Sequence, residues 1–168
     1  MARVLTLETT APPRPGAWPA EDIRDTGPGP AATTLPHDWA VLEQVPVGGG
    51  VIDRVIVGPN GVFAVHFDPD LRPAAVREHG VIRNGVRVKE PVKTALRNAF
   101  ALRALLAPDH PLVHPYPVLV TETPGNGARL GRLLVVRPGR LAEGVWQHLS
   151  RPMTRSERAR IVALLRSA

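Results

Sequence analysis

Two short apolar runs, at residues 51–57 and 62–67, flank the turn sequence Gly58-Pro59-Asn60-Gly61. Both runs are rich in valine, isoleucine and phenylalanine, and a glycine-bounded turn between two such runs is typical of a β-hairpin. One acidic residue, Asp53, interrupts the first run. Because a carboxylate inside an apolar strand loses its hydration, it needs a partner, a metal ion or a polar cleft. The hairpin therefore predicts both a sheet and the position of a functional site.

Side-chain alternation along the second strand places His66 and Asp68 on one face. If the hairpin turn has two central residues, Asp53 pairs with His66, and the three polar side chains share one patch. A three-residue loop with Gly61 as a bulge would shift the pairing by one and move Asp53 to the other face. Alternation alone leaves both registers open. The face opposite His66 carries Phe63, Val65 and Phe67.

The rest of the chain has a regular order of predicted elements. Strands are predicted at 39–47, 51–57, 62–67, 74–79 and 81–88, the last folding back at Asn84-Gly85. A helix is predicted at 91–106, followed by strands at 116–121 and 133–136 and by helices at 141–149 and 154–166. The two later strands are apolar on both faces, which is typical of central strands covered by helices. This order predicts an α/β fold in three layers, a mixed β-sheet with an antiparallel meander flanked by helices.

Length and composition limit the organisation further. With 168 residues, the chain is expected to form one domain, at 39–168. Residues 1–38 are rich in proline, which removes amide donors, so we expect a partly irregular N-terminal arm. Without cysteine, disulfides and thiolate metal sites are excluded. There is no apolar run long enough for a membrane span and no signal layout, so no membrane partner and a cytoplasmic location are expected.

The net charge of +6 is compatible with a nucleic-acid partner. Arginine dominates the basic residues, however, and with the abundant alanine, glycine and proline this is equally typical of a GC-rich bacterial genome. On the helix at 91–106, Lys93 and Arg97 lie to one side of the apolar stripe and Arg103 near its middle. Arg103 either extends to solvent from the last turn, where it complements the helix dipole, or reaches the Asp53 patch or a phosphate. Lys93, Arg97 and Arg103 are thus the candidate nucleic-acid contacts.

The segments VIDRVIVGPNGVFAV and VIRNGVRV, with the amphipathic helix after them, resemble the nuclease-related domain (NERD) family, whose pattern reads approximately iDhvvvGp-GvfviE-x-K. The resemblance covers about residues 39–106 and implies a restriction-endonuclease-like core of the PD-(D/E)XK type. The family's metal-binding aspartate falls on Asp53, which favours the register with two central turn residues.

The catalytic positions of the family are mostly changed in this chain. His66 stands at the position of its glutamate, Asp68 at that of its lysine, and Thr94 where a glutamine is frequent. The N-terminal Gly-Glu signature is not legible, Glu21 being a weak stand-in. Since the family's lysine orients or activates the attacking water beside an anionic substrate, an aspartate at this position should cost several orders of magnitude in rate.

The resemblance therefore implies a degenerate nuclease that acts as a nucleic-acid-binding or regulatory module. Its partners would be DNA or RNA, bound without sequence preference, or a protein. The alternative is an active metal-dependent nuclease, because imidazole and carboxylates can together bind a divalent cation such as Mg²⁺ or Mn²⁺. In either case Asp53, His66 and Asp68 are the candidate catalytic and metal-binding residues.

Overall fold

The computed structural model describes residues 3–5, 35–36, 38–78, 80–124, 127–148 and 151–168. Within these ranges, seven strands form one mixed sheet in the order β1-β2-β3-β4-β8-β10-β9. Strands β1 to β4 are antiparallel neighbours, β8 is parallel to both β4 and β10, and β9 closes the edge antiparallel to β10. The predicted α/β fold, with an antiparallel meander in a mixed sheet, is confirmed.

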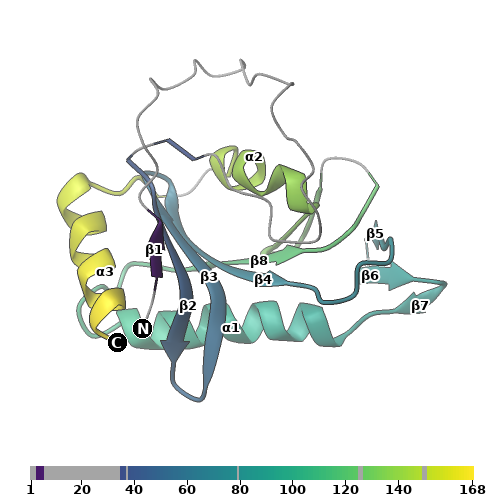
Figure 1. Cartoon of the computed structure of the whole chain (residues 1–168), viewed down its shortest axis with the longest axis horizontal. Coiled ribbons are helices and arrows are strands. Elements are labelled where there is room, and N and C mark those ends of the chain that lie inside the picture. Colours follow the sequence, from purple (N-terminus) through teal and green to yellow (C-terminus); the bar gives the residue numbers. More distant parts are fainter. Residues whose placement is uncertain (1–2, 6–34, 37, 79, 125–126, 149–150) are drawn as a thin grey trace.

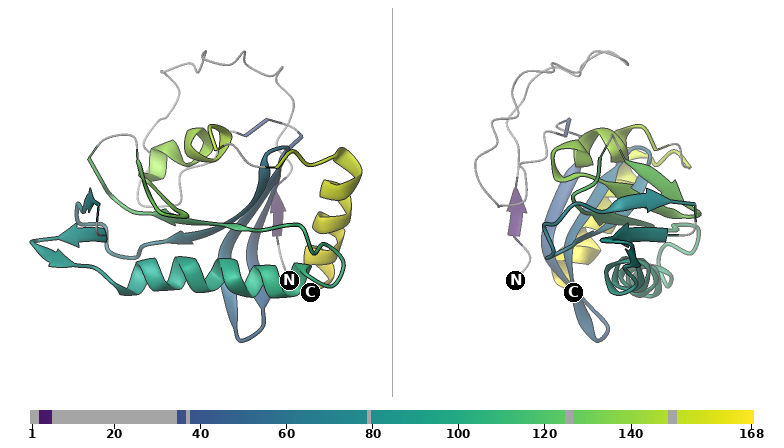
Figure 2. Two further views of the ribbon diagram at one scale, coloured as in Figure 1. Left: turned by 180° about the vertical axis from the view of Figure 1, so that it is seen from behind. Right: turned by 90° about the vertical axis from the view of Figure 1, so that its right-hand side faces the viewer.

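The large sheet consists of β1 (Arg3–Leu5), β2 (Ala40–Val47), β3 (Gly50–Gly58), β4 (Gly61–Phe67), β8 (Tyr116–Val120), β9 (Ala128–Leu130) and β10 (Leu133–Val136). A second sheet consists of β5 (Ala75–Arg77), β6 (Gly80–Arg83) and β7 (Val86–Arg87). The helices are α1 (Glu90–Leu106), the short 3₁₀ helix η1 (Pro138–Arg140), α2 (Leu141–Trp146) and α3 (Arg155–Ser167). The small sheet lies at the end of the molecule opposite α3 (Figures 1 and 2).

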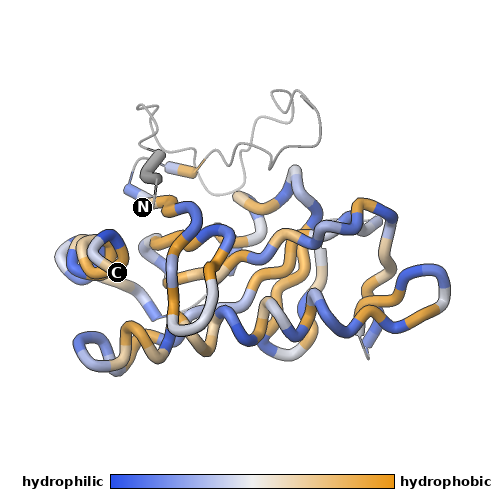
Figure 3. Tube along the Cα trace, turned by 60° about the horizontal axis from the view of Figure 1, so that its bottom comes forward, coloured by the Kyte–Doolittle hydropathy of each residue, from blue (hydrophilic) through white to orange (hydrophobic). Residues whose placement is uncertain are grey.

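Helices cover both faces of the large sheet, as the three-layer prediction requires. On one face, α1 and α3 bury Leu102 and Ile161 against Val55 and Ala64. On the other face, α2 packs against the side of β4 that carries Phe63. Apolar residues accordingly dominate the strands at the centre of the molecule (Figure 3).

Different helices cover the two faces of β4. Phe63 and Val65 are fully buried and Phe67 partly, on the face opposite His66, as alternation predicts. Helix α2 packs on them, and α1 covers the other face. Alternation separates the two faces of a strand without identifying the helix that packs on each.

The β3–β4 hairpin has the two-residue turn. Val57 pairs with Val62 and Gly58 with Gly61, so Pro59 and Asn60 are the central residues. Gly58 is required because the Trp39 ring packs directly against it: a Cβ there would lie 2.3 Å from a ring carbon.

The same turn connects elements that are far apart in the sequence. The Asn60 side-chain amide donates to the backbone oxygens of Val145 and His148, at 2.7 Å each, and so caps the C-terminal end of α2. The Pro59 carbonyl accepts from the Met153 amide at 2.8 Å, just before α3. The turn therefore positions both helices of the C-terminal third.

Other boundaries follow the sequence closely, with a few differences. Thr154 accepts a hydrogen bond from the Glu157 amide at 3.2 Å, so the predicted cap of the last helix is confirmed. Strand β9 and strand β1, which lies in the arm expected to be irregular, were not predicted. Most of the arm, and the predicted element ends at His79 and Leu149, lie outside the described residues.

Candidate functional site

Asp53 and His66 meet where strands β3 and β4 separate. The paired residues of the two strands extend from Gly58 and Gly61 to Arg54 and Val65, and Asp53 and His66 come next in the same register. There the Asp53 carboxylate replaces backbone pairing: its Oδ2 lies 2.8 Å from His66 Nδ1 and accepts from the Phe67 amide at 3.0 Å. The predicted pairing of Asp53 with His66 is confirmed.

The two hydrogen bonds fix the protonation of Asp53. Burial alone would raise the pKa of this carboxyl, but the bonds from His66 and from the Phe67 amide, together with the charge of His66, bring the pKa below its ordinary value of 3.8. Asp53 is therefore an anion at neutral pH. Its side chain is 35% exposed and that of His66 is 16% exposed, so the pair lies at the surface of the sheet.

Asp68 belongs to a different cluster. Its side chain is 1% exposed, and its Oδ2 accepts from Arg83 at 2.7 Å and from the Thr121 hydroxyl at 2.9 Å. Arg83, itself 5% exposed, also bonds Asp70 Oδ2 at 2.9 Å and the backbone oxygen of Arg72 at 3.0 Å. We call Asp68, Arg83, Asp70 and Thr121 the Arg83 cluster. The expected patch of three polar residues is thus wrong in one member, because strand β4 ends at Phe67 and β6 brings a buried cation to Asp68.

These residues do not fit a divalent cation. A metal ion needs carboxylate oxygens free to coordinate it, but one oxygen of Asp53 is taken by two donors and Asp68 is neutralised by Arg83. Within the described ranges, no three His, Cys, Asp or Glu side chains are grouped so that they could hold a metal. No step of a metal-dependent reaction can be derived from this arrangement.

The three candidate nucleic-acid contacts on α1 are all exposed. Lys93 forms an ion pair with Glu90 at 3.1 Å, one turn away. Arg103 is exposed in the last turn, as the first of its two alternatives predicts, and it donates to His114 Nδ1. Arg97 has no hydrogen bond or ion pair with any residue that the structure describes. None of the three is hydrogen-bonded to Asp53.

Two residues of this region were missed. Asn98 is a polar residue, but it is buried on the same side of α1 as Ala95 and Leu102. Phe100 is 73% exposed. Helical spacing gives the available signal: Phe100 is three positions after Arg97 and seven after Lys93, so all three share the outer side of the helix.

Comparisons with protein-family models, with curated proteins and with solved structures gave no match. In the part of the chain that the structure describes, no helix combines the length and apolar character needed to cross a bilayer.

Proposed function

We propose that this chain is a nuclease-related domain with a restriction-endonuclease-like core and a degenerate catalytic site, which acts by binding nucleic acid. The order of elements supports the proposal: an antiparallel meander, β2-β3-β4, is followed by the small sheet, by α1 and by β8, which is parallel to β4. The observation that carries it is the contact of Asp53 with His66 at 2.8 Å, at the two positions where the family has an aspartate and a glutamate. The Asp53 carboxylate, which would bind the metal ion in the family, is hydrogen-bonded to His66 instead.

The Arg83 cluster supports the loss of catalysis. At the position of the family's lysine, Asp68 and Arg83 compensate each other's charge, and both side chains are almost fully buried. A cation that activates water must reach the scissile phosphate, and a buried guanidinium held by two carboxylates cannot. The chain therefore retains the framework around the site without a group that performs the chemistry.

The outer side of α1 supports nucleic-acid binding. Arg97 and Lys93 provide two cations one turn apart, and the exposed Phe100 provides an aromatic face next to Arg97. Arginine and lysine neutralise phosphates, while an exposed ring stacks on unpaired bases. This combination favours single-stranded DNA or RNA, bound without sequence preference. A regulatory contact with a protein is the alternative use of the same surface.

Fluorescence anisotropy with a labelled single-stranded oligonucleotide tests the binding. We expect weak binding at low salt that is lost by about 200 mM salt, and a salt slope reduced by about 0.7 on Arg97→Gln, because one phosphate contact is removed. Phe100→Ala should weaken binding at every salt concentration without changing the slope. Arg160→Gln, an exposed arginine on α3, is the matched control. Binding that persists at high salt or depends on sequence would contradict the proposal.

A cleavage assay tests the loss of catalysis. The purified chain should not cleave single- or double-stranded DNA in the presence of Mg²⁺, because the site lacks both the second free carboxylate and the lysine. Robust Mg²⁺-dependent cleavage that disappears on Asp53→Ala would refute the degenerate site and favour the nuclease alternative.

A further inference from the structure

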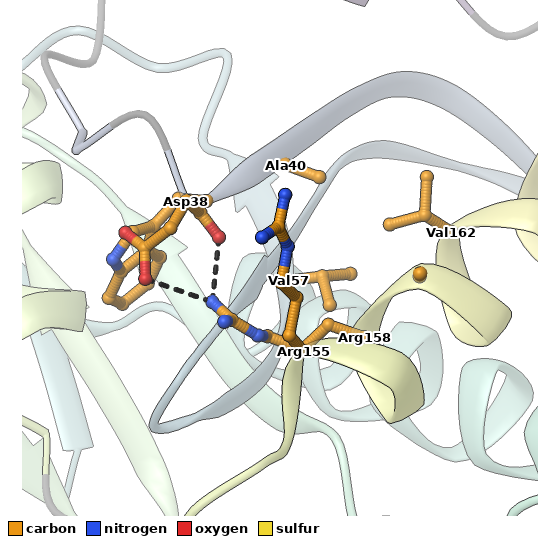
Figure 4. Close-up of a pocket in the computed structure, with 8 residues that line it drawn as sticks. Asp38, Ala40, Val57, Arg155, Arg158 and Val162 are labelled. Carbon is orange, nitrogen blue, oxygen red and sulfur yellow. Dashed lines mark hydrogen bonds and ion pairs between the residues drawn. The ribbon is translucent and has the colours of Figure 1, made fainter.

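A cavity of about 380 Å³ lies between the N-terminal half of α3 and the strands β2 and β3 (Figure 4). Its walls are mostly apolar, and none of its lining residues belongs to α1 or to the pair of Asp53 and His66. The apolar part consists of Trp39, Ala40, Val57, Ala159 and Val162, and the polar part of Asp38, Arg155 and Arg158. The volume is in the range of sites for small organic ligands.

The charge of the cavity is positive. Arg158 is held in place by Asp38, whose backbone oxygen and carboxylate it bonds at 2.7 and 3.1 Å. Its side chain is only 14% exposed, and its Nε is a buried donor with no acceptor in the described ranges. Arg155 is exposed, has no ion pair in the described part of the chain, and extends across the cavity towards Ala40 (Figure 4). The lining thus contains two guanidinium groups and one carboxylate.

We propose that this cavity binds a small amphiphilic anion, with an apolar body between α3 and the sheet and a single carboxylate or phosphate at the two arginines. The apolar side chains of the walls supply the affinity for the body, because an apolar body that covers them removes apolar surface from water. The arginines supply the preference for an anion: Arg155 is exposed and forms no ion pair with a described residue, and Arg158 adds a second positive charge to a lining that contains a single carboxylate.

Calorimetric titration with two anions and their neutral counterparts tests the chemistry. The probes are hexanoate with 1-hexanol, and phenyl phosphate with benzyl alcohol, and inorganic phosphate alone represents the head group. We expect at least one anion to bind at least about tenfold more tightly than its neutral counterpart and than inorganic phosphate. Preference for hexanoate indicates an aliphatic carboxylate, and preference for phenyl phosphate indicates an aryl phosphate. No saturable binding up to about 10 mM, or equal binding of the alcohols, would overturn the proposal.

Matched pairs of variants locate the site. Ala159→Leu fills the cavity from an exposed helical position and should abolish binding, whereas Ala163→Leu, one turn further and outside the cavity, should not. Arg155→Glu should weaken binding at least about tenfold, and Arg160→Glu, with the same change of charge on the same helix, should leave it unchanged. The Trp39 indole N–H resonance should shift during titration of the wild type and not of Ala159→Leu. Unchanged binding by Ala159→Leu would show that the anion binds elsewhere.

Discussion

Asp53 stabilises the point at which β3 leaves β4. A backbone amide at the end of a ladder needs an acceptor, and the Asp53 carboxylate supplies it for Phe67 while it also orients the His66 ring. The acid that marks the candidate site in the sequence therefore has a structural role of its own. Any loss of activity or binding on substitution of Asp53 has to be separated from a loss of stability.

Asp53→Ala should lower the free energy of unfolding at neutral pH by about 1–2 kcal/mol, because two hydrogen bonds to a partly exposed carboxylate are lost. The pKa of Asp53 is lowered on folding, so its contribution is present above the ordinary value of 3.8 and is lost as the pH falls through the lower folded value. The difference between wild type and variant in urea unfolding should accordingly vanish in acid. Asp109→Ala, at an exposed position, is the control.

His148 is a buried histidine that lies next to an arginine. It is 5% exposed, its Nδ1 lies 2.8 Å from an Arg129 nitrogen, and its ring centroid is 3.9 Å from that of Tyr116. Because Arg129 can only donate, Nδ1 accepts, and the ring proton is on Nε2, which has no acceptor among the residues that the structure describes. Burial, and then the charge of Arg129, lower the pKa of His148 below 6.5.

Acid should therefore destabilise the fold through His148. The unfolded chain takes up this proton at its ordinary pKa of 6.5 and the folded chain only at lower pH, so stability is fully present above 6.5 and decreases below it. Urea unfolding at about pH 7.5 and about pH 5.5 should show the loss in the wild type and a smaller one in His148→Gln. In His114→Gln, which changes an exposed histidine, the loss should be as large as in the wild type; an equal reduction there would assign the effect to another group.

At the scale of elements, the Arg83 cluster connects the two sheets. Arg83 is the last residue of β6, whereas Asp68 follows β4 and Thr121 follows β8. Three segments of the chain thus meet at one guanidinium group, in addition to the apolar cluster that includes Val81 and Leu119. The small sheet is held to the large one by charge as well as by packing.

Arg83→Leu should destabilise the protein by about 3–5 kcal/mol, since it leaves the Asp68 carboxylate buried without its cation. Adding Asp68→Leu should recover much of this loss, because the second change removes the unpaired charge. Amide hydrogen exchange should show the largest loss of protection in β5, β6 and β7. An equal cost for the single and the double variant would mean that the cluster contributes through packing alone.

The Arg83 cluster also alters the simplest route back to a nuclease. From the sequence, His66→Glu with Asp68→Lys is the minimal change that supplies the family's glutamate and lysine. Asp68→Lys, however, places a second cation against the buried Arg83. The double variant should therefore unfold at lower urea concentration than His66→Glu alone, and only the further change Arg83→Gln should restore its stability.

At the scale of the whole molecule, patterns of neighbouring residues predicted the features that depend on neighbouring residues, such as the bounds of strands and helices. Strand β10 has the predicted bounds, α1 differs by one residue, and Asp53 meets His66, because these features depend on alternation, helical spacing and one turn. The partners of Asp68 could not be obtained in this way, since Arg83 approaches from another sheet. One signal was available: Arg83 interrupts an apolar strand, and a cation in such a strand needs a buried anion.

The cap that Asn60 places on α2 has a consequence for the order of folding. The turn can form as soon as its hairpin does, whereas its bond to Val145 joins positions 85 residues apart, so a long loop must close before it forms. We expect Asn60→Gly to accelerate unfolding strongly and to leave the refolding rate nearly unchanged in stopped-flow experiments, because this contact is absent from the transition state. The arrival of α2 at a finished turn would then be a late event on the way to the native state.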